Sequence, residues 1–249
     1  MKSVLTTFLM TTLVCAGSVA VAQETNGMNT GETVADAAVP QNNAMAKIKD
    51  VPGLPRVLLI GDSISIAYTL PVRALLQGKA NVHRIPVNGS ATGTGVAGVK
   101  SWVGTGRWDV VVFNFGVHDA KLYDSEGKVA QTREGAHPAT SIEAYTNNLQ
   151  KIINLLKPTG ASLIFATTTP IPEVTTGRLF DFIPPRNAAA LEVMKANGVA
   201  ICDLYSAILP RWKEFLRPGD VHFAPGGSAV LASEVVRSVE AKMATQKAE

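Results

Sequence analysis

Cysteine is almost absent from this sequence, which limits how the chain can be held together. The 249 residues contain only two cysteines, Cys15 and Cys202. Because we expect the N-terminal segment that carries Cys15 to be removed, no intramolecular disulfide is predicted for the mature chain. Cys202 ends the apolar run Val-Ala-Ile-Cys, which is typical of a buried strand. We therefore interpret it as a small core thiol rather than a nucleophile.

Neither sign of charge dominates the sequence. Lys and Arg together number 23 and Asp and Glu number 20, so the formal net charge is +3, and the basic residues form no cluster. A nucleic acid or an anionic membrane surface is therefore not expected as a partner. The hydrophobic share of 46% is sufficient for a sizeable core in a chain of this length.

The sequence also lacks an apolar run long enough to span a membrane, for which ~20 predominantly apolar residues are needed. At the N-terminus, Lys2 precedes a short apolar stretch interrupted by Thr, Ser and Gly, and Ala-Val-Ala at residues 20–22 gives a small-x-small pattern. This predicts a signal peptide over residues 1–22 and export to a periplasm or the cell exterior, without stable membrane insertion after cleavage. The bulky Val14 before Cys15 argues against lipidation of that cysteine.

The rest of the sequence predicts a linker and one folded domain. Residues 23–50 are rich in small and polar residues without periodicity, which is typical of a disordered linker. Over residues 51–246, short β-rich runs alternate with helical patterns, which indicates an α/β domain with a parallel sheet. We expect strands at residues 56–60, 82–87, 110–114, 162–168 and 199–202. The main helices are expected at residues 70–76, 96–103, 142–156, 188–197 and 225–246.

Four polar motifs stand where such a sheet would bring them together. Gly-Asp-Ser at residues 61–63 follows the first strand, and Asn-Gly-Ser-Ala-Thr-Gly at 88–93 follows the second. Gly-Val-His-Asp at 116–119 follows the third strand, and Gly-Asp-Val-His at 219–222 precedes the last helix. In open α/β sheets the ligand site lies beyond the carboxyl ends of the strands. Alone, a Ser after Gly-Asp can simply cap a helix, but the four motifs together supply the groups that acyl transfer requires.

This combination resembles the SGNH, or GDSL-type, hydrolases, a family of esterases and acylhydrolases, over about residues 52–242. The resemblance implies a flavodoxin-like three-layer sandwich with a five-stranded parallel sheet. It also implies that Ser63 is the nucleophile and that His222 is the general base. The family places the acid three residues before this histidine, where the chain has Gly219. We predict that Asp220, two residues before it, completes a Ser-His-Asp triad; the alternative is a Ser-His dyad aided by a backbone carbonyl.

The resemblance further implies an oxyanion hole. Its backbone donors would be the N–H groups of Ser63 and Gly93, with Gly89 as the alternative to Gly93. His118 occupies the place where the family normally has Asn, as in a subgroup with Gly-x-His-Asp in this motif. A neutral imidazole carries one N–H and can replace the Asn as a donor. The alternative is that His118 merely forms an ion pair with Asp119.

Two further motifs do not indicate a cofactor or a metal. The run at residues 93–98 satisfies the dinucleotide pattern Gly-x-Gly-x-x-Gly, but it follows the second strand rather than the first and lacks the acid farther on. His83 and His137 are not accompanied by Cys, Asp or Glu at ligand spacing. We therefore predict neither a cofactor nor a metal.

The predicted function is hydrolysis of a small-molecule or carbohydrate ester. The long segments 121–139 and 169–185 follow the third and fourth strands and are expected to shape the substrate pocket. Arg178 and Arg186 are predicted to meet a carboxylate or sugar hydroxyl groups of the substrate. We expect an exported serine esterase for a short acyl group such as acetyl. The alternatives are a sugar O-acyltransferase using the same site and a non-catalytic SGNH-like carbohydrate-binding module, and the oligomeric state is left open.

Overall fold

A computed structural model describes residues 44–130, 132–175 and 177–248. The predicted signal peptide and residues 23–43 of the predicted linker lie outside the described residues. No helix within the described part of the chain combines the length and the hydropathy that a membrane span requires.

The last part of the predicted linker packs on the domain. Arg84 donates a hydrogen bond from Nη1 to Met45 Sδ at 3.2 Å. Asp50 forms an ion pair with Arg56 at 2.9 Å, and its Oδ1 lies 2.5 Å from His83 Nε2. The boundary predicted at residue 50 is therefore too late, and the folded domain includes residues 44–50. Composition could not indicate this because the partners of these residues belong to strands that follow in the sequence.

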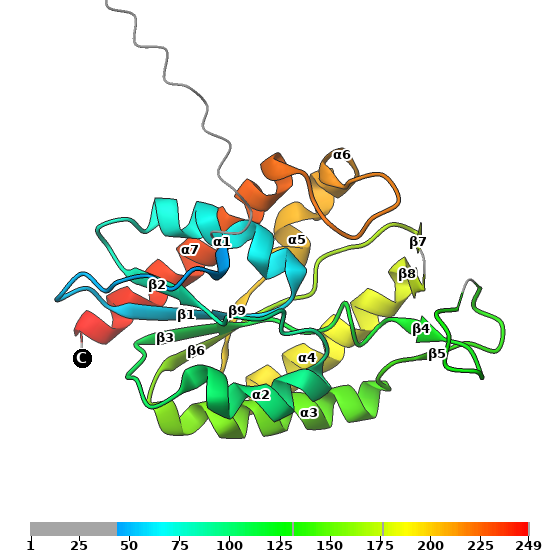
Figure 1. Cartoon of the computed structure of the whole chain (residues 1–249), viewed down its shortest axis with the longest axis horizontal. Helices are drawn as coiled ribbons and strands as arrows, with labels where there is room; N and C mark the ends of the chain where they lie inside the picture. Colours follow the sequence, from blue (N-terminus) through cyan, green and yellow to red (C-terminus); the bar gives the residue numbers. More distant parts are fainter. Residues whose placement is uncertain (1–43, 131, 176, 249) are drawn as a thin grey trace, which may run out of the picture. The chain divides into compact units, whose positions relative to one another are not determined.

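The domain is built on a five-stranded sheet in which every pair of neighbours is parallel, in the order β2-β1-β3-β6-β9 (Figure 1). This is the flavodoxin-like order, in which the chain starts near one edge and then moves across the sheet. The α/β fold predicted from the sequence is confirmed. The strands are β1 (Arg56–Ile60), β2 (Asn81–Arg84), β3 (Val110–Phe113), β6 (Ser162–Ala166) and β9 (Ala200–Cys202).

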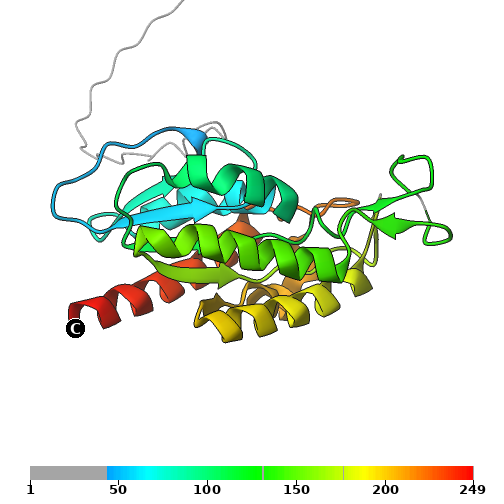
Figure 2. The same cartoon turned by 90° about the horizontal axis from the view of Figure 1, so that it is seen from below.

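Helices cover both faces of the sheet (Figure 1 and Figure 2). Successive side chains of β1 point to opposite faces, so Val57 and Leu59 join one core cluster and Leu58 and Ile60 join the other. The first cluster is completed by α1 (Ser63–Leu75), α5 (Leu204–Ile208) and α7 (Pro225–Ala248). The second is completed by α2 (Thr92–Val103), α3 (Ile142–Leu156) and α4 (Ile183–Asn197). Burial on both faces explains why the central strands are continuously apolar.

Several helices begin earlier than the sequence predicted. Helix α1 begins at Ser63 because Asp62 Oδ1 accepts a hydrogen bond from Ile64 N at 2.9 Å and caps it. Helix α4 begins at Ile183, since proline is tolerated in the first turn of a helix. The short elements η4 (Leu209–Arg211) and α6 (Trp212–Phe215), like α5, were not expected.

Two hairpins occupy the long segments that follow β3 and β6. They pair β4 (Leu122–Tyr123) with β5 (His137–Pro138), and β7 (Val174–Thr175) with β8 (Arg178–Leu179). Figure 1 shows both at the same end of the molecule, and Leu122 N donates to Gly177 O at 2.7 Å between them. Both segments therefore lie beyond the carboxyl ends of the strands, as the sequence predicted.

Candidate active site

The turn from β1 into α1 presents Ser63 at the start of a helix. Ser63 is partly exposed, so a substrate can reach it, whereas Asp62 before it is buried. Ser63 Oγ lies 2.6 Å from His222 Nε2 across 159 positions of the sequence. The structure thus joins two of the predicted site residues that come from opposite ends of the domain.

Asp220 reaches the other side of the same imidazole ring. His222 Nδ1 lies 2.7 Å from Asp220 Oδ1. Because an ionised carboxylate only accepts hydrogen bonds, Nδ1 must carry the proton, which leaves Nε2 free to accept from the Ser63 hydroxyl group. Burial acts to raise the pKa of Asp220, but the hydrogen bond to His222 and the charge of His222 outweigh it and hold that pKa below its ordinary value.

The loop before α7 explains how an acid at this unusual spacing reaches the histidine. Gly219 has φ of +68°, a left-handed conformation that favours glycine, so the chain reverses before Asp220. Arg217 closes the reversal, because its N–H donates to His222 O at 2.9 Å and its carbonyl accepts from Asp220 N at 3.1 Å. The residue that departs from the family pattern, Gly219, is therefore the one that allows Asp220 to face His222.

The loop before α2 and the first turn of this helix carry the two glycines between which the prediction of a second backbone donor was left open. Gly93 is exposed in the first turn of α2, where N–H groups have no partner within the helix. The Asp119 carboxylate accepts from Thr92 N at 3.1 Å and so fixes this turn. Gly89 N instead donates to Gly61 O at 2.9 Å. Its N–H is already used, and the geometry favours Gly93 over the alternative Gly89.

His118 is a partly buried neutral imidazole. Burial, followed by the charges of Arg178, Lys121 and His222, lowers its pKa from 6.5 to about 4. Its Nδ1 lies 3.5 Å from Ser90 Oγ, so a proton donated by this hydroxyl group leaves the ring proton on Nε2. The alternative reading, an ion pair between His118 and Asp119, is not observed among the described residues, because that carboxylate accepts hydrogen bonds from Thr92.

This lowered pKa makes a prediction for folding stability. The pKa of His118 is about 4 in the folded chain and 6.5 when the chain is unfolded. Its contribution to the free energy of unfolding is therefore complete above pH 6.5 and is lost as the pH falls towards 4. His118→Asn should remove this loss, which we place at about 1–2 kcal/mol after allowing for solvent screening of a partly exposed ring. Urea unfolding at about pH 7.5 and pH 4.5 measures it.

The comparison with the Asn variant is needed because Asp62 acts in the opposite direction. Burial raises the pKa of Asp62 to about 6, which favours the folded state as the pH falls and partly masks the effect of His118. Wild type and the His118→Asn variant both contain Asp62, so its contribution cancels when their losses of stability are compared. Equal losses of stability in wild type and His118→Asn would contradict the titration assigned to His118.

Arg84 is a buried residue that the sequence analysis did not single out. Its Nη2 donates to Gly61 O at 2.9 Å, to Asp62 O at 3.1 Å and to Ser65 Oγ at 2.8 Å. Its Nη1 donates to two carbonyl groups beyond the end of β2. Arg84 thus joins the turn that carries the nucleophile candidate to the loop that leads to α2. The only sequence signal was a charged residue inside the strand predicted over residues 82–87.

The two arginines predicted to bind substrate have different environments. Arg186 is 1% exposed, and its Nη2 donates to Asp119 O at 3.1 Å and to Thr140 O. The prediction for Arg186 is therefore wrong, since its guanidinium supports loops from within. Arg178 is partly exposed, and its Nε donates to Val117 O at 2.9 Å, beside His118.

Two of the three glycines in the pattern at residues 93–98 have a packing role inside α2. A Cβ atom at Gly95 would lie 2.6 Å from the Phe115 ring, and one at Gly98 would lie 2.2 Å from the Trp102 ring. Both glycines therefore allow close side-chain packing. Among the described residues, no group of three or more His, Cys, Asp and Glu side chains is arranged to hold a metal ion.

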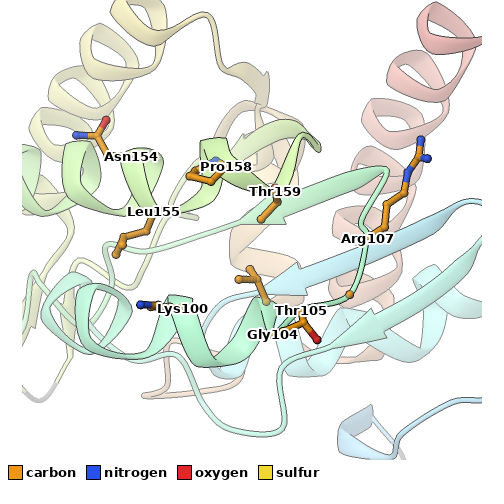
Figure 3. Close-up of a pocket in the computed structure, with 10 residues that line it drawn as sticks. Lys100, Gly104, Thr105, Arg107, Asn154, Leu155, Pro158 and Thr159 are labelled. Carbon is orange, nitrogen blue, oxygen red and sulfur yellow. The ribbon is translucent and has the colours of Figure 1, made fainter.

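A pocket of about 490 Å³ lies at the opposite edge of the sheet (Figure 3). It is lined by the end of α2, the loop 104–107 and the segment after α3, with Lys100, Arg107 and Pro158 among its residues. These segments lead into the amino ends of β3 and β6. The pocket is therefore separate from the Ser63–His222–Asp220 cluster.

The sequence pattern of the GDSL-like lipase/acylhydrolase family matches residues 59–230, well over half of the chain. The protein belongs to this family of SGNH/GDSL hydrolases and is an enzyme that hydrolyses ester bonds. No curated protein sequence gives a significant match.

Solved structures share the fold at low sequence identity. A lipase/acylhydrolase from Enterococcus faecalis is 21% identical with a TM-score of 0.62, covering 76% of this chain and 97% of that one. A variant of an acetyl-xylooligosaccharide esterase from Geobacillus is 18% identical with a TM-score of 0.60, covering 74% and 94%. An acetyl xylan esterase is 17% identical with a TM-score of 0.59, covering 74% and 99%.

Proposed function

We propose that this protein is an exported serine esterase that removes a short acyl group, such as acetyl, from a carbohydrate. The observation that carries the proposal is the continuous hydrogen-bonded chain from Ser63 Oγ through His222 to Asp220, with distances of 2.6 and 2.7 Å. The acetyl group and the carbohydrate are supported by the two structural relatives that are esterases of acetylated xylan or xylooligosaccharide. Export is supported by the signal-peptide pattern of residues 1–22.

In the proposed mechanism, His222 Nε2 takes the proton of the Ser63 hydroxyl group as its oxygen attacks the ester carbonyl carbon. The alcohol leaves with this proton, and an acyl group remains bonded to Ser63 Oγ. A water molecule then gives one proton to His222 while its oxygen attacks the acyl carbon; the bond to Ser63 Oγ breaks, Oγ takes the proton back from His222, and the acid is released. Asp220 holds the imidazole ring in the required tautomer throughout.

The developing oxyanion would be stabilised by the N–H groups of Ser63 and Gly93 and by Nε2–H of His118. Because its pKa is about 4, the His118 ring stays neutral above this pH, and its hydrogen bonding does not change with a gain of charge.

Replacement of His118 tests this assignment. His118→Ala should lower kcat by about 100- to 1000-fold, the usual effect of losing one oxyanion donor. His118→Asn should recover most of that loss, because its amide offers an N–H at the position where the family normally has Asn. Steady-state kinetics with p-nitrophenyl acetate measure both variants. An alanine variant within a few-fold of wild type would assign His118 a purely structural role.

Covalent labelling tests the proposed function directly. A fluorophosphonate should label the wild-type protein once, at Ser63, and Ser63→Ala should remain unlabelled while keeping its circular dichroism spectrum. Absence of labelling in folded wild type would exclude a serine esterase and favour a binding module. If unlabelled wild type turns over p-nitrophenyl acetate only when a sugar acceptor is added, the reaction is acyl transfer instead of hydrolysis.

A further inference from the structure

Arg178 stands at the edge of the candidate active site without an acidic partner. Its Nε donates to Val117 O at 2.9 Å, and the side chain is partly exposed. Within the described residues, no carboxylate lies within ion-pair distance of Arg178, and its terminal nitrogens donate no hydrogen bond. Burial lowers the pKa of this guanidinium, so its charge is held at a cost. A partly buried cation without a counter-charge is typical of a site that awaits an anion.

The two hairpins hold Arg178 in place. Gly177 before it is buried with φ of +67°, and a Cβ atom there would lie 2.3 Å from Val129 Cγ1. Its carbonyl accepts a hydrogen bond from Leu122 N at 2.7 Å. The backbone next to Arg178 is thus fixed between the hairpins, so the guanidinium is presented in an orientation set before substrate arrives.

A second cation, Lys121, lies nearby, since its backbone N–H donates to His118 O at 3.2 Å and its Cγ atom would lie 3.7 Å from a Cβ atom at Gly177. After burial, the charges of Arg178 and then Lys121 are the main causes that lower the pKa of His118, so both cations lie within electrostatic range of this ring. Asp62 and Asp220 influence Arg178 only at longer range. Of these carboxylates, Asp62 is buried and Asp220 is bonded to His222. Neither carboxylate is therefore a direct partner of the Arg178 guanidinium.

We infer that Arg178, with Lys121 nearby, binds a carboxylate carried by the ester substrate, close to the carbonyl carbon that Ser63 attacks. The inference rests on the proposed function and specifies its substrate class. A guanidinium binds a carboxylate through two parallel N–H donors, which supplies orientation as well as attraction. The carboxylate can belong to the acyl group or to the alcohol, which in a carbohydrate would be a uronic acid.

Two matched pairs of esters test the inference and distinguish its two forms. For the acyl side, mono-p-nitrophenyl succinate is compared with p-nitrophenyl butyrate. For the alcohol side, an acetylated methyl glucuronoside is compared with the acetylated methyl glucoside. We expect wild type to favour the charged member of one pair by about 10-fold or more in kcat/KM, as for a hydrogen bond to a charged group. Raising NaCl from about 0.05 to about 0.5 M should reduce this preference in wild type without affecting the neutral ester.

Variants separate charge recognition from structural support. Arg178→Gln should abolish the preference, lowering kcat/KM for the charged ester by about 10-fold more than for its neutral partner, because the amide can still donate to Val117 O but carries no charge. Arg178→Lys should retain part of the preference. Arg237→Gln, which removes an exposed charge on α7, should behave as wild type.

The outcomes are distinguishable from failure of the proposed function. If neutral esters are hydrolysed but neither charged ester is preferred, or if the preference survives in Arg178→Gln, the inference alone is wrong. An equal loss for charged and neutral esters would show that Arg178 acts through Val117 and His118 instead. If no ester is hydrolysed and Ser63 is not labelled, the proposed function and the inference both fail.

Discussion

Ser63→Ala and His222→Ala should each lower kcat by about a millionfold, and the double variant should be no slower than either single variant. The reason is the 2.6 Å contact between Ser63 Oγ and His222 Nε2, because the hydroxyl group attacks only while its proton passes to the ring. With either partner missing, that route is closed. Steady-state hydrolysis of p-nitrophenyl acetate provides the measurement.

A matched serine variant guards against a general effect of substitution. Ser101 is exposed on α2, where its hydroxyl group donates to Gly98 O, and Ser101→Ala should keep wild-type kcat. The residual rate of the three active-site variants should still exceed that of water by about 1000-fold, from the oxyanion donors and binding. Losses that multiply in the double variant would mean that Ser63 and His222 act independently.

Asp220→Ala should lower kcat by about 10,000-fold. Asp220 Oδ1 lies 2.7 Å from His222 Nδ1, and its pKa is held below the ordinary value, so an ionised carboxylate fixes the tautomer and offsets the charge of the imidazolium. Without it, the ring can rotate or carry its proton on Nε2, where it could not accept from Ser63. Kinetics at saturating substrate, compared with KM, should show that the loss lies in kcat.

Two additional variants make the Asp220 result decisive. Glu192→Ala removes an exposed carboxyl group on α4 and should leave kcat unchanged. Asp220→Asn keeps the size of the side chain and should lose nearly as much activity as the alanine variant, because its amide can present an N–H to the ring. A loss of only a few-fold in both Asp220 variants would favour a Ser-His dyad.

The central strands and α3 were predictable because burial alone determines their patterns. Apolar runs of four residues stand at β1 and β3, and the helical stripe predicted over residues 142–156 matches α3. The start of α2 at Thr92 was missed because its first turns are rich in glycine, a poor helix former. There the helix is held by packing and by the Asp119 carboxylate, which lies 27 positions farther along the sequence.

The candidate site likewise contains residues that could be predicted from the sequence and residues that could not. Ser63, His222 and Gly93 could be placed by motif and by their position after strands. The reach of Asp220 could not be predicted, because it depends on the backbone conformation of Gly219 and on the hydrogen bonds of Arg217. The burial of Arg186 could not be predicted either, since arginine is normally exposed and two of its three carbonyl partners, Asp119 O and Thr140 O, lie far from it in the sequence.

The left-handed turn at Gly219 has a consequence for recognising relatives of this protein. A search pattern that demands an acid three residues before the histidine would discard this chain, although its carboxylate reaches the same nitrogen. A pattern that also admits glycine at that position, followed directly by the acid, should find proteins in which the acid stands one residue later. In these proteins the left-handed glycine would return the carboxylate to the histidine. In such chains the glycine would mark the catalytic loop as clearly as the acid does.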